Sequence, residues 1–210
     1  MSQAQLSIAP AMSVSSRKAA QILASARTLF IENGFGATSM EAVAQHAKVG
    51  KATVYAHYSS KDELFAAVIA AEGAVNSLDL NSDPAASPAI VLRRFGKQAM
   101  ALLLAPSNIA VRRMISAEAT RIPELGRLYF ESGPSALIDG LAAYLGQIMD
   151  KGQMRREDPR FAAAQYLGMI VGDLQLRAMI GVKDSGSEAH RKAVLESGIA
   201  AFFRAYDVEE

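Results

Sequence analysis

The residues best suited to chemistry are gathered in one short stretch, AKVGKATVYAHYSSKDELF, which spans Ala47 to Phe65. It places two tyrosines and a histidine among three lysines and several small residues: Lys48, Lys51, Tyr55, His57, Tyr58 and Lys61. Imidazole and phenol groups this close to amines could form a catalytic cluster, a metal site or a surface that fits another polymer. The elements that carry these side chains decide between the three.

The rest of the chain offers little support for catalysis. Its 210 residues include no cysteine, which removes disulfides, thiolate metal sites and cysteine nucleophiles together. No HExxH, GxSxG or phosphate-binding loop occurs, and the histidines at 46, 57 and 190 lack ligand spacing, although folding could still gather distant groups. We therefore expect no enzymatic activity, no metal and no cofactor.

Charge and hydropathy indicate where a partner binds. Residues 1–61 hold six lysines and arginines against two acidic residues, whereas the remainder carries a net charge of −3. Such a basic first third suggests that one end meets a polyanion, and chance unevenness is the alternative for a difference this small. The longest apolar runs fall far short of the ~20 residues that span a membrane. The N-terminus lacks the features of a signal peptide, so we expect a flexible tail at 1–15 and a cytoplasmic protein.

Hydrophobic spacing is helical almost throughout, and no alternating run between turn signals predicts a strand. We expect an all-α protein with a three-helix helix-turn-helix domain at 16–63 and a helical bundle for effector binding and dimerisation at 64–210. A polar, proline-containing segment at 79–88 is the clearest linker. Helices then follow at about 88–105, 107–121, 123–151 with a break at Gly133-Pro134, 158–181 and 187–206.

The helix starts carry recognisable signals. Thr38 with Glu41, Ser60 with Glu63, and Ser185 with Glu188 each have the spacing of a capping box. Gly34 is suited to the residue that follows the first helix, since it accepts a left-handed conformation.

A long helix followed by two short helices and a tight turn predicts that the helix at 51–57 lies in a DNA major groove. Its outer face carries small residues and its flanks carry polar ones: Ala52, Thr53 and Ala56 on the face, and Lys51, Tyr55 and His57 beside it. Small residues let the helix approach base edges, and the flanking groups reach toward phosphates. The residues we expect to contact DNA are Thr38, Ser39, Lys48, Lys51, Ala52, Thr53, Tyr55, His57 and Lys61.

Each of these residues also has a plain structural interpretation. Tyr55 could be a packed surface tyrosine, His46 and His57 could be solvated, and Thr38 and Ser60 could be helix caps alone. A helix-turn-helix pattern is a weak signal by itself, and the ordered set is stronger than any member.

Residues 17–65 resemble the N-terminal domain of TetR-family transcriptional regulators. The matching features are Phe35-Gly36, Thr38-Ser39, Val43-Ala44, Ala47, Val49, Thr53-Val54-Tyr55, His57, Tyr58 and Lys61-Asp62-Glu63-Leu64. The resemblance implies a homodimer whose two recognition helices enter successive major grooves of a palindromic operator in double-stranded DNA.

Three positions depart from the family pattern. Lys48 and Ala52 stand where the family usually has glycine, and Gly50 stands where it often has serine. Lys48 costs roughly 1 kcal/mol or more if its backbone is left-handed, and Gly50 lacks a capping hydroxyl.

The segments RIPELGRLYFESGP and DPRFAAAQYLGMIVGDLQLRAMIG look similar to the C-terminal domain of the AefR-like subgroup. This similarity implies a small effector of unknown identity, with efflux or resistance genes as plausible targets. We expect the last two helices to form the dimer interface, because they are apolar around much of their circumference and a palindromic DNA site requires two readers. The alternative is a monomeric bundle core.

An effector pocket is expected to be apolar with a few polar anchors. The candidates are Met100, Met114, Glu118, Met169, Asp173 and Arg177, with core filling the commoner role for each methionine and an ion pair the commoner role for Asp173 with Arg177. A ligand-responsive regulator, most simply a repressor, explains these features best. The alternative is a helical small-molecule-binding protein without functional DNA binding.

Overall fold

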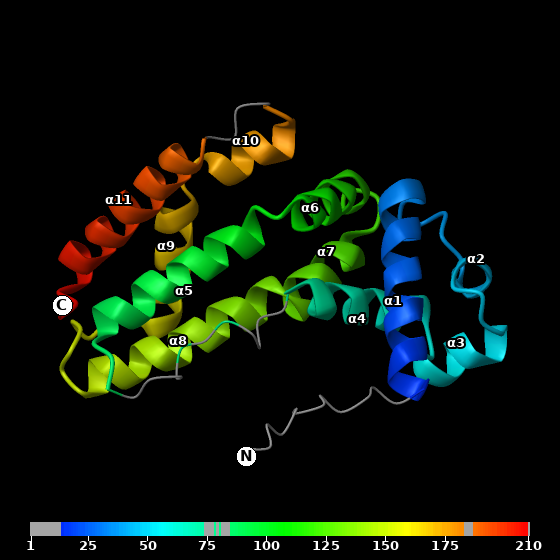
Figure 1. The fold of residues 1–210 in the computed structure, drawn as a ribbon, viewed down its shortest axis with the longest axis horizontal. Helices are drawn as coiled ribbons and strands as arrows, with labels where there is room; N and C mark the ends of the chain where they lie inside the picture. Colours follow the sequence, from blue (N-terminus) through cyan, green and yellow to red (C-terminus); the bar gives the residue numbers. More distant parts are fainter. Residues whose placement is uncertain (1–13, 74–77, 79, 81–84, 183–186, 210) are drawn as a thin grey trace, which may run out of the picture.

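The computed structural model describes residues 14–73, 78, 80, 85–182 and 187–209, and over these residues the protein is entirely helical (Figure 1). The helices are α1 (Val14–Asn33), α2 (Met40–His46), α3 (Lys51–His57), α4 (Lys61–Gly73), α5 (Pro88–Leu103), α6 (Pro106–Glu118), α7 (Pro123–Ser132), α8 (Pro134–Asp150), α9 (Pro159–Val171), α10 (Leu174–Ile180) and α11 (Glu188–Tyr206). The all-α prediction is confirmed. None of the described helices is both long and apolar enough to cross a membrane.

Two hydrophobic cores organise the molecule. The first core is formed by α1, α2, α3, α4, α6 and α7. The second is formed by α5, α8, α9 and α11. Figure 1 shows α1, α2 and α3 at one end of the molecule and the C-terminus of α11 at the other. Because α6 and α7 contribute to the first core, the end that carries α3 is packed directly onto the body.

The loop between α1 and α2 is fixed by an aromatic cluster. Phe35 in this loop lies 5.5 Å from the Phe30 ring of α1 and 5.2 Å from the Phe65 ring of α4, measured between ring centroids. All three rings are buried, and such tilted or edge-on pairs add to the free energy of burial. The loop is therefore tied to both helices that support α3.

Helix α9 is the centre of the body and lies between α8 and α11. The hydroxyl of its buried Tyr166 donates a hydrogen bond of 2.6 Å to the Leu92 carbonyl of α5. Gly198 of α11 faces the Met169 and Ile170 backbone of α9 so closely that a Cβ at this position would collide with it. One face of α11 therefore packs inside its own chain.

Three predicted helix boundaries need correction. The helix expected at 158–181 is two helices, because Gly172 adopts φ 51° and ψ −133° and interrupts the hydrogen-bond ladder. The N-cap of α2 is Ser39, whose Oγ accepts from Ala42 N at 3.1 Å, and not Thr38. At α11 the N-cap is Ser187, while the predicted cap Ser185 lies outside the described residues. Residues 1–13 of the tail predicted at 1–15, and half of the predicted linker, also lie outside them, whereas residues 14 and 15 already belong to α1.

Candidate nucleic-acid interface and ligand pocket

Helix α3 is positioned from beneath by its one buried residue and by the turn before it. Val54 is fully buried in the first core, and the carbonyl of Ala47 in the turn accepts a hydrogen bond of 2.8 Å from Gln21 of α1. Lys48 has a φ of 51°, which is the left-handed conformation expected at a position where the family usually has glycine. This conformation is strained for a residue that has a Cβ. Gly50 caps α3 without a side-chain hydrogen bond, so packing rather than capping fixes this helix.

The outer face of α3 is exposed, as the helical wheel predicts. Ala52 and Ala56 are exposed, Thr53 is half-buried, and Tyr55 is 42% exposed. Lys51 lies with its Nζ 5.6 Å from the centre of the Tyr55 ring, within range of a cation–π contact. This face therefore has small side chains at its centre, with the Lys51 ammonium and the Tyr55 phenol at its edge.

Lys51 is also paired with Glu41 of α2. The hydrogen bond and charge of Lys51 lower the pKa of Glu41, and the same contact raises the pKa of Lys51. Both side chains are more than half exposed, so the pair contributes little to stability. A DNA phosphate could take the place of Glu41 beside Lys51.

The remaining predicted contacts surround this face. Ser39 and Lys48 are exposed, and His57 is half-buried next to Tyr58. Ser39 is the N-cap of α2, so its exposed side chain stands at a helix N-terminus, where the helix dipole favours an anion.

Thr38 and Lys61 are placed differently from what the sequence suggested. Thr38 is only 3% exposed, and its hydroxyl donates to the carbonyls of Leu29 and Gly34 at 3.1 and 2.8 Å. The Nζ of Lys61 donates to the carbonyls of Phe35 and Thr38 at 2.9 and 3.0 Å. Both side chains therefore hold the loop between α1 and α2, instead of facing outward toward a phosphate.

Ser60 is a helix cap, as predicted, because its Oγ accepts from Glu63 N at 3.1 Å. The Glu63 carboxylate differs from the capping-box prediction. It accepts from the backbone N–H and the hydroxyl of Ser59 at 2.7 and 2.5 Å, one residue earlier than expected.

The six predicted pocket residues do not converge on one cavity. Met100 and Met114 are buried in separate cores, and Met169 packs at the edge of the second core. Arg177 Nε donates to Asp173 at 2.6 Å, so the expected ion pair is present on the surface of α10. Glu118 accepts from the backbone N–H groups of Phe35 and Gly36, and this contact joins α6 to the loop before α2.

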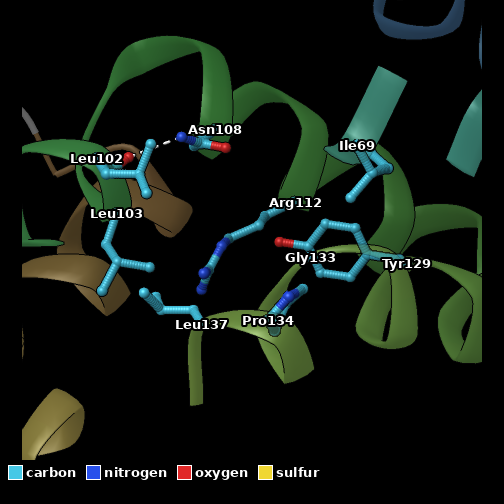
Figure 2. A pocket seen from close by; sticks show the side chains of 9 residues that line it. All are labelled: Ile69, Leu102, Leu103, Asn108, Arg112, Tyr129, Gly133, Pro134 and Leu137. Carbon is cyan, nitrogen blue, oxygen red and sulfur yellow. Dashed lines mark hydrogen bonds between the residues drawn. The ribbon is translucent and has the colours of Figure 1, made fainter. Parts of the chain in front are cut away.

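Three adjoining pockets lie instead between α5, α6, α7, α8 and α10. One is lined by α4 to α8 (Figure 2), the second extends toward α9, and the third lies between α6, α7 and α10. The second and third have volumes of about 210 and 440 Å³. Arg112 is the one residue common to all three, and Tyr129 lines two of them.

Sequence reasoning missed both residues. The buried side of α6 is formed by Val111, Met114 and Ile115. Because Arg112 and Arg113 fall between these positions, one of the two arginines had to lie close to the buried side. That spacing was the available signal, but it does not reveal a cavity, because the cavity is enclosed by residues from several distant helices.

A small, exposed helix presented by a preceding helix and turn, on an all-helical body with pockets between its helices, is typical of a helix-turn-helix DNA-binding protein. Residues 22–68 match the profile of the bacterial regulatory proteins of the tetR family, and residues 90–208 match the C-terminal domain of AefR-like transcriptional repressors. The chain therefore belongs to the TetR family of DNA-binding transcriptional regulators, in which repression and release by an effector are typical.

Solved structures agree with this assignment. The flavonoid-responsive regulator FrrA is 36% identical, with a TM-score of 0.76 over 91% of this chain and 97% of that chain. A TetR-family regulator from Mesorhizobium loti MAFF303099 is 28% identical, with a TM-score of 0.74 over 93% and 99%. A TetR regulator from Agrobacterium tumefaciens, 24% identical with a TM-score of 0.73 over 93% and 95%, supports the fold alone. The curated proteins gave no significant match.

Proposed function

We propose that this regulator is a homodimeric repressor that binds a palindromic operator through α3 and leaves it when a small molecule binds. The observation that supports this most directly is the outer face of α3. Its exposed alanines allow the helix backbone to approach base edges, while Lys51 and Tyr55 stand at the rim where phosphates would lie. Residues 16–63 would act as the DNA-binding unit and residues 64–210 as the effector and dimerisation unit.

The proposed DNA contacts fall into two groups. Ala52, Thr53 and Ala56 would face the bases, with the Thr53 hydroxyl and methyl providing sequence preference. The phosphate contacts would come from Ser39, Lys48, Lys51, Tyr55 and His57. Thr38 and Lys61 are left out of this set because their polar atoms bind backbone carbonyls within the protein.

The proposed dimer interface is the exposed stripe of α9. Phe161 is 71% exposed, and Ala164 and Gly168 are exposed one and two turns further along the same face. A Cβ at Gly168 would meet nothing within 4 Å, so a second helix can approach closely here. A large exposed aromatic beside small residues is typical of a surface that is covered in an assembly.

The proposed effector is a small molecule with an aromatic or extended apolar body. The pockets around Arg112 are lined mainly by apolar side chains, and the 440 Å³ pocket falls in the usual ~300–1,000 Å³ range of small-molecule sites. The solved relative FrrA is named as flavonoid-responsive, which supports an aromatic ligand for this chain. Binding without catalysis is sufficient for this function, because an effector that prefers the DNA-free conformation shifts the population toward it.

The first test is a salt-titrated footprint on the DNA that flanks the gene for this protein. A protected, two-fold symmetric site is expected, and Thr53→Val is expected to change its sequence preference while keeping nonspecific affinity. Phe161→Glu should yield a monomer by light scattering and lose the symmetric footprint. Salt-sensitive coating without a defined site would count against the proposed operator, and a dimeric Phe161→Glu variant would count against the interface.

A further inference from the structure

The three pockets around Arg112 share an unusual charge arrangement. Their linings are apolar or neutral except for the Arg112 guanidinium, and no aspartate or glutamate lines any of them. The neutral Asn108 is already committed, since its Nδ2 donates to the Leu102 carbonyl at 2.7 Å (Figure 2). One positive charge therefore faces a cavity that offers it no opposite charge.

The guanidinium is also incompletely hydrogen-bonded. The Nε of Arg112 is buried and has no hydrogen-bond partner among the described residues. Arg112 extends from α6 between Leu103 and Leu137 on one side and Tyr129 on the other (Figure 2). A buried donor without an acceptor is costly, so a ligand that supplies an acceptor gains free energy by satisfying it.

The neighbouring Tyr129 is suited to share the same ligand group. Burial raises the pKa of the Tyr129 phenol, and the charge of Arg112 and its hydrogen bond to this phenol lower it in part. The hydroxyl therefore remains protonated at neutral pH and, while it accepts from Arg112, can donate its own proton to a ligand. Arg112 and Tyr129 would thus present two kinds of donor to one acceptor, from facing helices α6 and α7.

We propose that the effector carries an acidic oxygen, either a carboxylate or an ionised phenol, and that Arg112 binds this group while the apolar walls hold the rest of the molecule. A guanidinium suits such a role because it remains charged when buried and presents paired donors to an oxyanion. The inference rests on the proposed effector-responsive function and adds the chemical class of the effector to it.

The test compares two probes of matched shape, 4-phenylbenzoate and 4-phenylbenzamide, by calorimetry on the full-length protein. The carboxylate is expected to bind at least about tenfold more tightly than the neutral amide, in line with a charge-assisted hydrogen bond. Equal affinities, or no binding of the carboxylate at millimolar concentration, would exclude a carboxylate effector, and the proposal is overturned if the phenol test below fails as well.

Variants then assign the preference to one side chain. Arg112→Met is expected to bring the two affinities to within about twofold, and Arg112→Lys to retain part of the difference, because it keeps the charge but not the paired donors. Lys97→Met is the matched control, since it removes one exposed positive charge from α5 outside the pocket linings. A preference that survives in Arg112→Met would contradict the assignment.

The phenol source is tested separately with 4-nitrophenol, whose ionised form absorbs visible light. At a pH just below the pKa of this phenol, wild-type protein should increase the absorbance of the ionised form, and Arg112→Met should not. An increase with the phenol but no carboxylate preference would restrict the effector to phenols, and a decrease would exclude them.

A footprint in parallel separates this inference from the proposed function. Specific DNA binding with neither a carboxylate preference nor an increase of the ionised phenol would overturn the anionic effector and leave the regulator intact. A preference for the charged probe without any specific DNA site would support an anionic ligand and overturn the proposed DNA-binding function.

Discussion

Glu118, the last residue of α6, accepts a hydrogen bond of 2.6 Å from the backbone N–H of Phe35, which lies in the loop that leads into α2. The N–H of Gly36 donates to the same carboxylate at 2.9 Å, and Gly34 approaches it so closely that a Cβ there would collide with it. Arg112 and Glu118 lie on one helix, so the helix that lines the pocket also holds the DNA-binding end.

Glu118→Ala should therefore weaken the connection between these two regions. Two backbone donors lose a charged acceptor, which costs about 1–3 kcal/mol in the free energy of unfolding. Urea denaturation measures this loss, and a DNA titration with and without effector measures the coupling, which should become smaller. Glu32→Ala, at an exposed carboxylate of α1, is the control. Unchanged stability and coupling in Glu118→Ala would show that the contact is dispensable.

Lys61→Met should act on stability, because its ammonium binds carbonyls of the same loop that Glu118 holds through N–H groups. Its Nζ donates to Phe35 and Thr38 carbonyls and lies 4.4 Å from the centre of the Phe35 ring. Losing these contacts should cost on the order of 1–3 kcal/mol, with little change in the salt dependence of DNA binding. A salt slope reduced by about one, with unfolding unaffected, would instead return Lys61 to the phosphate contacts.

Lys48→Gly should separate stability from DNA affinity. Its φ of 51° is unfavourable for a residue with a Cβ, so glycine should increase the free energy of unfolding by about 1 kcal/mol. The same change removes an exposed cation beside α3, so DNA binding should weaken with a salt slope reduced by about 0.9. Lys48→Ala keeps the strain and removes the charge, and it should show only the second effect.

The sequence predicted well those features that depend on local spacing. Helix α3 begins and ends at the expected residues, and Val54 is buried because one position in a short amphipathic helix must face the core. Gly34 and Lys48 both have positive φ, as their places after a helix and inside the turn imply.

Features that depend on distant partners could not be predicted in this way. Their polarity and the family pattern predict that Thr38 and Lys61 contact DNA. Their hydroxyl and ammonium are instead used by carbonyls that the fold brings near. Glu118 meets its partners across 83 positions, and no local pattern encodes such a contact. The pocket around Arg112 is similarly formed by residues from several helices.

Two glycines on the central helices should respond oppositely to alanine. Gly198→Ala would place a Cβ against the Met169 backbone, so α9 and α11 must separate, and a loss of about 1–3 kcal/mol is expected. Within a single subunit, Gly168→Ala has open space around it and should stabilise α9 by about 0.5–1 kcal/mol through helix propensity. Thermal unfolding at low protein concentration compares the two. Similar shifts for both would contradict the close approach of α9 and α11.

The start of α4 should make stability depend on acidic pH through Glu63. Hydrogen bonds from the Ser59 hydroxyl and N–H lower the pKa of Glu63 below its ordinary value of 4.5. The folded state therefore binds fewer protons than the unfolded state in this range, and the contribution is present above about pH 4.5 and lost as pH falls through the lowered pKa. Glu63→Gln should lower the urea midpoint most near neutral pH, and the difference from wild type should shrink at about pH 3. Ser59→Ala should remove part of the same dependence, since it deletes one of the two donors. A difference that is constant from neutral to acidic pH would mean that the Glu63 side chain acts through its shape and not through its charge.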